Sequence, residues 1–517
     1  MSRRRTVISL ISFAALAGCA VPALASTKAR TTYAATTAAS TSGTAGLGAY
    51  RLVSYEPTTQ VSGPQTFAED LWGTYNDAQV QSDLSLLSGM GANAVRIFVS
   101  TGDTGTYPSI SPTFSSNLGD FVHTAQADGL KVVLSIFNQY PYIPAVSGGW
   151  SDTASAAKWM SSLVAPYKNN PEIAYLEMRN EVPAPGYDSP TPSGSGTQAA
   201  AWLNALMPQL RVDAGSDPIV LSQNHGVAGY EALDSALSAA AKPDAYSYHF
   251  YDYPGFLGGQ LALLEQNLSK PVFVGETGYS TALSNTVGGG AGLAQDQNVR
   301  NAYQAWYLQA VSFVTNTMGL GNPGMWQLWD TPNASSAYET DFGLYDNSSG
   351  TTVAKPAAAA LSAVFAAAAT SSAILAPSIN GTFDTSSSGS GAIPSPWSAQ
   401  YIGGQVSSSS AQGGNSLCIT RAGNDSYFYE TLPLASASGL HTLTAWTTGG
   451  NWFTSIAIRW LNSAGTPVGF DVRTYQNAPV SGWKELAAAG TAPPGASTAM
   501  IILQGNSAGC FSNVAFS

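Results

Sequence analysis

Residues 94–99 read Ala-Val-Arg-Ile-Phe-Val, a six-residue apolar run with a single arginine inside it. Runs of this length that are rich in β-branched and aromatic residues are typical of buried strands. Similar runs recur along the chain, and helical patterns such as 78–89, 153–167 and 295–315 lie between them. The other apolar runs are 50–54, 131–137, 173–178, 218–221, 245–249, 271–275 and 324–329.

Strands that alternate with helices predict an α/β fold built on a parallel sheet. The alanine-rich segment 355–369 is the expected closing helix. An open dinucleotide-binding sheet is the alternative, but it would carry a glycine-rich phosphate-binding turn, and none follows the first run. We therefore predict a (β/α)8 TIM barrel over residues 48–371.

Residues 1–25 have the pattern of an export signal: a cluster of arginines, an apolar stretch and an Ala-Leu-Ala cleavage site. A second interpretation of residues 16–19 is a lipoprotein signal in which Cys19 carries a lipid anchor. The apolar residues that follow Cys19 favour the first interpretation. Residues 26–47, rich in Ser, Thr and Ala, read as a tether. We expect a secreted, extracellular protein, with anchoring through Cys19 as the alternative.

The last part of the chain has a different sequence pattern. A short linker at 372–377 precedes residues 378–517, where short alternating runs are separated by turns and no helical pattern stands out. This organisation predicts an all-β sandwich. Cys418 and Cys510 are the only cysteines after Cys19, and two cysteines in an exported chain predict one disulfide.

Charged residues make up 10% of the chain and the net charge is -11, which argues against nucleic acid as a partner. The 12 Trp and 24 Tyr suit a neutral ligand with flat apolar faces, such as a sugar, although many of them are expected to fill cores. No stretch after the export signal reaches the roughly 18 to 20 apolar residues of a membrane span. No histidine lies at ligand spacing from the cysteines, so no metal site is expected.

In a TIM barrel the catalytic groups stand at the carboxyl ends of the strands. The fourth and seventh strands lie on opposite sides of the barrel, so Glu181 and Glu276 can face one another across the cavity. Cleavage of a glycosidic bond needs two such carboxylates, one to protonate the leaving oxygen and one to attack or to activate water. The polar and aromatic residues at the expected strand ends are Arg96, Asn180, Glu181, His249, Tyr251, Glu276 and Trp326.

The neighbouring residues fit this chemistry. Arg96 beside Glu276 would keep that carboxylate ionised, and Tyr251 could orient it. Asn180 can hydrogen-bond the 2-hydroxyl of the sugar, and Trp326 offers a flat face on which the sugar can stack.

Residues 48–370 resemble the clan-A glycoside hydrolases, and glycoside hydrolase family 5 in particular. The matching pieces are Gly91 to Arg96, Asn180-Glu181, His249-x-Tyr251, Glu276 after an apolar run, Trp326-Gln327 with Asp330 behind, and Lys355-Pro356-Ala357. The resemblance implies a TIM barrel and a retaining mechanism without a cofactor. It makes Glu181 the acid/base and Glu276 the nucleophile, and places His249 among the substrate-binding residues.

The sequence departs from the family pattern at two places. Val182 stands where the family has a proline after Asn-Glu. Asn138 and Gln139 stand where it has a histidine near the end of the third strand, and His225 is a possible replacement. These departures bear on the substrate and not on the two carboxylates.

Residues 378–517 resemble the jelly-roll carbohydrate-binding modules that accompany such enzymes. The matching pieces are Asn380 to Asp384, Trp397 and Phe511 to Val514. Trp446 is out of phase with the core positions of its run, and Trp452 lies in a glycine-flanked loop, so both are candidates for a ligand face. Trp460, in phase with two isoleucines, is expected in the core. The alternative is a packing or spacer domain.

Together these observations predict a monomeric, endo-acting β-glycanase on a plant or microbial polysaccharide of glucan or mannan type. An exo-acting β-glycosidase on oligosaccharides is the first alternative, and a blind pocket would favour it. A noncatalytic carbohydrate-binding or adhesion protein is the second, but a barrel without activity has no need of two carboxylates at its mouth.

Overall fold

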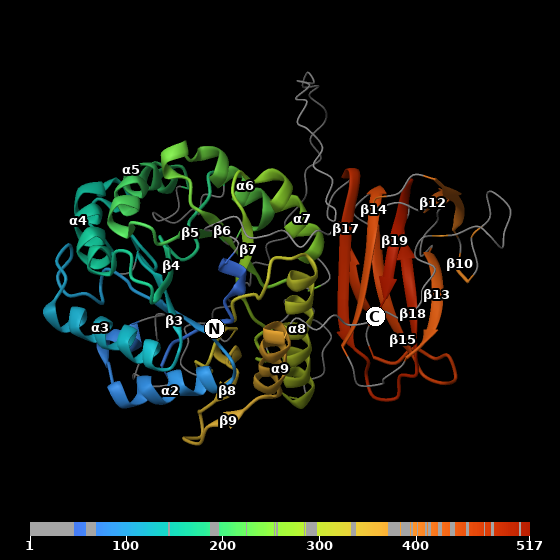
Figure 1. Ribbon diagram of the computed structural model, residues 1–517, viewed down its shortest axis with the longest axis horizontal. Helices are drawn as coiled ribbons and strands as arrows, with labels where there is room; N and C mark the ends of the chain where they lie inside the picture. Colours follow the sequence, from blue (N-terminus) through green and yellow to red (C-terminus); the bar gives the residue numbers. More distant parts are fainter. Residues whose placement is uncertain are drawn as a thin grey trace, which may run out of the picture. The chain divides into compact units, whose positions relative to one another are not determined.

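Figure 1 shows the computed structural model of the chain. The export signal, nearly all of the tether, the linker at 372–377 and Trp452 lie outside the described residues, so the predictions on them remain open. The structure describes residues 46–57, 69–142, 145–186, 196–223, 225–252, 254, 257–283, 285, 297–331, 338–370, 383, 393, 396–400, 402–408, 411, 415–421, 427–434, 440–450, 454–469, 471–476, 480–505 and 508–516.

Seven parallel strands form a nearly closed barrel in the described part of the chain, and they neighbour one another in chain order from β1 to β7. Figure 1 shows the helices around the outside of these strands. The TIM-type barrel predicted from the apolar runs is therefore confirmed. The strands are β1 (Leu52–Ser54), β2 (Ala94–Phe98), β3 (Lys131–Ser135), β4 (Ile173–Glu177), β5 (Ile219–Gln223), β6 (Ala245–Phe250) and β7 (Val272–Thr277).

The predicted eighth strand is wrong as a continuous strand. Met325 of that segment pairs in parallel with Val53 of β1 and with Thr277 of β7. Beyond it the backbone turns to another partner, because Trp329 pairs with Tyr345 at the start of a small two-stranded sheet. Between these two points Trp326 N donates to the Thr277 carbonyl and Leu328 N donates to the Ser54 carbonyl, so the segment closes the ring without forming a regular strand. The small sheet consists of β8 (Tyr345–Asp346) and β9 (Val353–Ala354).

The helices form where capping residues and apolar periodicity coincide. In α3 the Ser111 side chain accepts a hydrogen bond from Phe114 N at 3.2 Å, and a proline occupies the first turn. Its buried face includes Phe114, Leu118 and Phe121, at helical spacing. The helices are α1 (Glu69–Gly73), α2 (Asp77–Gly89), α3 (Pro112–Ala127), α4 (Thr153–Val164), α5 (Gly196–Ala214), α6 (Gly226–Ala236), α7 (Leu257–Asn267), α8 (Gln297–Thr317) and α9 (Pro356–Thr370).

The C-terminal part consists of two antiparallel sheets of five described strands each, in the orders β10-β13-β18-β15-β16 and β11-β12-β19-β14-β17. Trp460 is 2% exposed and lies in their shared apolar core, as predicted. The strands are β10 (Ser398–Gln400), β11 (Gly403–Ser407), β12 (Ser416–Arg421), β13 (Tyr427–Pro433), β14 (Leu440–Gly449), β15 (Ser455–Leu461), β16 (Val472–Tyr475), β17 (Val480–Thr491), β18 (Thr498–Gln504) and β19 (Gly509–Phe516).

Among the described residues, none of the helices has the length and apolar character required to cross a membrane.

The predicted disulfide joins Cys418 of β12 to Cys510 of β19, two residues that face each other across the antiparallel strands. The bridge closes a loop of 92 residues. By the loss of chain entropy in the unfolded state, a loop of this length stabilises the fold by roughly 4 kcal/mol. Replacing both cysteines by alanine should lower the free energy of unfolding by about that amount, measured by urea denaturation under oxidising conditions. Equal denaturation midpoints for the two proteins would contradict the expectation.

Candidate active site

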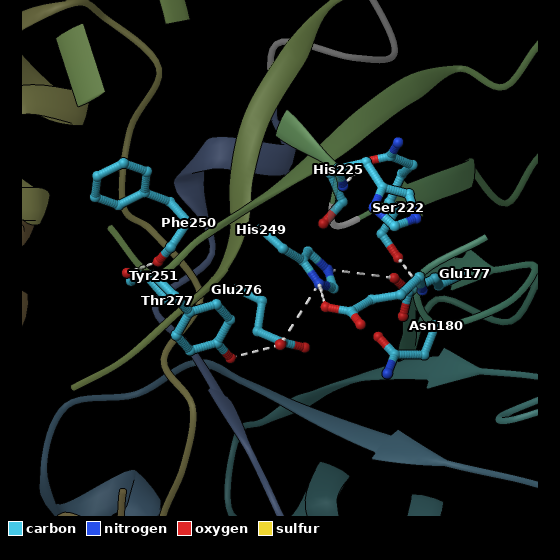
Figure 2. Close-up of polar contacts among 12 residues, drawn as sticks. Glu177, Asn180, Ser222, His225, His249, Phe250, Tyr251, Glu276 and Thr277 are labelled. Carbon is cyan, nitrogen blue, oxygen red and sulfur yellow. Dashed lines mark hydrogen bonds and ion pairs between the residues drawn. The ribbon is translucent and has the colours of Figure 1, made fainter. Parts of the chain in front are cut away.

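The candidate catalytic residues come from four parallel strands and lie toward their carboxyl ends. Figure 2 shows Asn180, His249 and Glu276, which come from three of them. Arg96 lies on β2, and Asn180 and Glu181 follow β4. His249 lies on β6, and Glu276 near the end of β7. Because the carboxyl ends of parallel strands meet at one face of a barrel, these side chains come together although 180 residues separate the first from the last.

Arg96 is the centre of this cluster. Its side chain is 1% exposed, and it donates hydrogen bonds to Glu177 Oε2 from Nε and Nη2, at 2.9 and 2.6 Å. Its Nη1 donates to Glu276 Oε2, and its Nη2 donates to Asn180 Oδ1 at 2.8 Å. Burial alone would lower the pKa of the guanidinium, but Glu177 and Glu276 outweigh it and raise that pKa. Arg96 is therefore a permanent positive charge held between two carboxylates.

Sequence reasoning missed Glu177, the last residue of β4. The only signal was a single glutamate inside the apolar run 173–178, where a charged side chain must point either outward or to a buried partner. The side chain is 1% exposed and pairs with Arg96.

The His249 ring is fully buried between carboxylates. Its Nδ1 lies 3.1 Å from Glu181 Oε1 and 3.5 Å from Glu276 Oε1. Figure 2 marks the contact between His249 and Glu276 with a dashed line. Its Nε2 lies 3.8 Å from Glu177 Oε1. Burial lowers the pKa of His249, but Glu276 and Glu181 outweigh it and raise the pKa above its usual value. His249 thus contacts both candidate catalytic carboxylates directly.

Tyr251 donates a hydrogen bond to Glu276 Oε1 at 2.6 Å (Figure 2). Burial and the nearby Glu276 raise the pKa of Tyr251 well above its usual value, so the hydroxyl stays protonated and remains a donor. With Arg96 on the other oxygen, both oxygens of Glu276 are held. The Trp326 ring meets the Phe98 ring edge to face at 5.6 Å.

Glu181 lies in a turn with φ of 53°, in the left-handed region. Its backbone N–H donates to Ser222 Oγ at 3.0 Å, and the next N–H, from Val182, donates to the Ser222 carbonyl at 2.9 Å. A proline at position 182 would lack that N–H. The departure from the family pattern therefore coincides with a hydrogen bond to β5 that proline could not make.

One oxygen of Glu181 and one of Glu276 lie within 4.8 Å of each other and of His249. The exposed fractions of the two carboxylates differ: 27% for Glu181 and 6% for Glu276. Three such donors could also surround a cation, so the expectation of no metal stays a prediction.

A cavity of about 290 Å³ lies over the two carboxylates. Asn138, at the position of the missing family histidine, is in its wall, whereas His225 is not among the described lining residues and is instead the N-cap of α6. The lining residues are Phe98, Asn138, Asn180, Glu181, Tyr251, Glu276, Trp326, Tyr338, Glu339 and Phe342.

Glu339, in the short 3-10 helix Glu339–Asp341, is a third carboxylate in this wall that sequence reasoning missed. Burial and the charges of Glu276 and Glu181 raise the pKa of Glu339 to about 7, and a hydrogen bond with the Trp326 side chain partly opposes this. Nothing in the pattern around residue 339 resembles a strand end, which explains the omission.

Trp446, proposed for the ligand face of the sandwich, is half-buried on β14. It alternates with the buried Leu443 and Ala445 positions in the phase that the sequence predicted.

Comparison with known proteins identifies the barrel. Residues 53–331 match the family described as Cellulase (glycosyl hydrolase family 5). The comparison with curated proteins found no match. Among solved structures, GH5_18 from Streptomyces cattleya with bound Manβ1-4GlcNAc is 15% identical, with a TM-score of 0.48 over 61% of this chain and 82% of that one. An exo-β-1,4-mannosidase from Opitutaceae bacterium strain TAV5 is 17% identical, with a TM-score of 0.47 over 62% of this chain and 59% of that one.

Glu181 and Glu276 both fall inside the matched residues, and the family model spans more than half of the chain. The chain therefore belongs to glycosyl hydrolase family 5, and its barrel is a glycoside hydrolase domain.

Proposed function

We propose that the chain is a retaining enzyme that hydrolyses a β-linked polysaccharide by double displacement. The observation that carries this proposal is the separation of the carboxylates, within 4.8 Å between an oxygen of Glu181 and an oxygen of Glu276. Retaining glycosidases hold their two carboxyl groups about 5 to 5.5 Å apart, and inverting ones about 6.5 to 9.5 Å apart. A separation of this order favours direct attack by a carboxylate.

Glu276 is the proposed nucleophile. It is 6% exposed, and Arg96 and Tyr251 donate to its two oxygens. The positive charge of Arg96 favours the ionised form that attack requires. With its orientation fixed in advance, Glu276 can form the ester bond to the anomeric carbon as the bond to the leaving oxygen breaks.

Glu181 is the proposed acid/base. In the first step it gives its proton to the leaving glycosidic oxygen, and in the second it takes a proton from the water that hydrolyses the ester to Glu276. Between the two steps Glu181 is ionised. A protonated His249, 3.1 Å away, can then donate to it.

Asn180 is the proposed partner of the sugar 2-hydroxyl. Because a guanidinium can only donate, the bond from Arg96 Nη2 identifies the amide oxygen and directs the NH2 group elsewhere. Asn180 lines the cavity, so the NH2 group is available to the substrate there. This hydrogen bond would strengthen at the transition state.

We propose cleavage inside a glucan or mannan chain as the primary activity. The second candidate, removal of terminal sugars, is favoured by the small volume of the cavity and by its wall of Trp326, Tyr338 and Glu339. Incubation with a panel of β-glucans and β-mannans tests both: internal cleavage gives products of many lengths at once, and terminal cleavage gives one small sugar. Absence of hydrolysis on every β-glycan and aryl β-glycoside would overturn the proposed function.

We also propose that the protein is exported and that its sandwich holds the polysaccharide near the active site. The export pattern of residues 1–25 and the bridge between Cys418 and Cys510 support export. The half-buried Trp446, out of phase with the core positions of β14, supports sugar binding by the sandwich. The competing explanation is a packing role for the sandwich, and the substitution Trp446→Ala separates sugar binding from packing.

The roles of the two carboxylates predict different responses to substitution. Glu276→Ala should abolish turnover of every substrate, a loss on the order of 10⁴-fold or more. Glu181→Ala should slow natural substrates strongly, but should spare the first step on aryl glycosides whose leaving group needs no proton. Burst kinetics with a dinitrophenyl glycoside test the roles of the two carboxylates. The anomeric form of the first product, determined by NMR, tests retention of configuration. Equal losses on all substrates, or an inverted product, would show that the assignment is wrong.

Glu339 predicts a pH-dependent stability. Its carboxyl has a pKa of about 7 in the folded protein and the usual lower value when unfolded, so the folded state holds the proton more tightly. Wild-type stability should therefore fall, relative to that of Glu339→Gln, as the pH rises from about 4.5 to about 7. The difference should be on the order of 2 kcal/mol, obtained from urea denaturation at pH 5 and pH 8. If the difference in unfolding free energy between the two proteins does not depend on pH, this prediction is wrong.

Trp446→Ala in the full chain should weaken co-sedimentation with insoluble polysaccharide about 3- to 10-fold, because one stacking contact is lost. Hydrolysis of soluble substrates should not change. Tyr429→Ala, at a half-buried position on the other sheet, is the matched control. Equal effects of both substitutions, or none, would favour the packing role.

A further inference from the structure

Arg179 lies between the end of β4 and the Asn180-Glu181 pair, and its side chain has no part in the mechanism above. The residue is 5% exposed. None of the carboxylates in the described part of the chain forms an ion pair with it. Burial lowers the pKa of Arg179 to about 10, in contrast to the raised pKa of Arg96. A buried guanidinium without an ion pair is costly, so its hydrogen bonds must have a strong structural or functional reason.

These hydrogen bonds all go to backbone carbonyls. Nε donates to the Tyr140 carbonyl at 2.7 Å, Nη1 donates to the Asn180 carbonyl at 2.6 Å, and Nη1 also donates to the Glu181 carbonyl. The guanidinium lies over the rings of Tyr142 and Trp150, at 5.8 and 5.6 Å from their centroids. The aromatic rings hold the plane of the guanidinium, and its edge is directed at the catalytic turn.

The residue that receives this bond has an unfavourable backbone conformation. A glutamate with φ of 53° costs about 1 to 2 kcal/mol relative to ordinary backbone. Its carbonyl accepts from Arg179, and its N–H donates to Ser222 Oγ at 3.0 Å. Both backbone polar groups of Glu181 are thus held by side chains, from two directions. The direction of the Glu181 carboxyl depends on this backbone.

We propose that Arg179 is a positioning residue for the acid/base: it holds the left-handed backbone of Glu181 so that the carboxyl reaches the leaving oxygen. The inference rests on the role proposed for Glu181. It assigns to Arg179 no contact with the substrate. The competing explanation is that Arg179 only ties the segment around Tyr140 to the end of β4, in which case its loss would affect all substrates alike.

The test uses the full chain, the variants Arg179→Met and Arg179→Lys, and aryl β-glycosides whose phenol leaving groups range from acidic to weakly acidic. The sugar is one that the wild type hydrolyses. If Arg179 positions the acid, kcat/KM should fall about 10- to 100-fold for the poorest leaving group, within the contribution of general acid catalysis. For the dinitrophenyl glycoside it should change by less than about 3-fold. Lysine keeps the charge but not the planar fork, so Arg179→Lys should also steepen the dependence on the leaving group.

Azide gives a second measurement. A small anion can replace the water that Glu181 activates, so azide should accelerate turnover of the dinitrophenyl glycoside by Arg179→Met and give a β-glycosyl azide. Arg300→Met is the matched control. Arg300 is 2% exposed and donates to the carbonyls of Ala282 and Leu283, at 2.8 and 3.3 Å, but does not contact the Glu181 turn. Its substitution should lower thermal stability without changing the dependence on the leaving group.

A uniform loss across the leaving groups, or none, would overturn the inference. Should Arg179→Met fail to fold, which its thermal unfolding would show, the same comparison with Arg179→Lys decides. Glu181→Ala separates this failure from failure of the proposed function. If Glu181→Ala shows the leaving-group dependence and the Arg179 variants do not, only the positioning role is wrong. If Glu181→Ala does not show it either, the acid/base assignment is wrong.

Discussion

The structure of the site depends on the ion pairs of one buried arginine. Arg96 is 1% exposed and joins Glu177 of β4 to Glu276 of β7 from its own position on β2. An isolated charge in the centre of an apolar barrel would cost several kcal/mol or more, and the cost falls only when opposite charges and hydrogen bonds surround it. Each member of this triad therefore requires the others, and the three strands must present them at matching heights. The parallel register of the barrel is what makes that possible.

The same triad divides the carboxylates of the site into two kinds. Glu177 and Glu276 pair with Arg96 and are almost fully buried, whereas Glu181 lies beyond its reach and is 27% exposed. Glu181 instead contacts His249, whose imidazole also approaches Glu276. The two carboxylates that we propose perform different chemistry are thus placed in different surroundings, although one oxygen of each lies within 4.8 Å of the other. All three residues are glutamates, so the difference in their surroundings arises from which strand ends contact Arg96.

Much of this could be predicted from the sequence because the information is local. Each apolar run marks a strand, and the polar residues that follow it lie at the mouth of the barrel, which is how Glu181 and Glu276 were found. Arg96 lies inside its run, and the family motif from Gly91 to Arg96 singled it out. Glu177 was missed because it lies inside a run, and Glu339 because a short helix far from any strand end brings it to the cavity. The eighth run closes the barrel through Met325, Trp326 and Leu328 without a continuous strand, and its end pairs with Tyr345, which no local pattern reveals.

The residues after β4 show how a barrel can fix two candidate catalytic groups by different means. Arg96 holds the side chain of Glu276 by charge, and the cost of burying that arginine is offset by the two carboxylates. Arg179 holds carbonyls, which carry only partial charges, and the aromatic rings beneath it supply the rest of its surroundings. A bond to the carbonyl does not add a positive partner to the nearby carboxyl. An arginine that gripped the Glu181 carboxylate itself would favour the ionised form and so oppose the proton that an acid must carry. Because Arg179 acts through the backbone, it avoids that conflict. This gives a physical reason why Arg96 and Arg179 have such different partners.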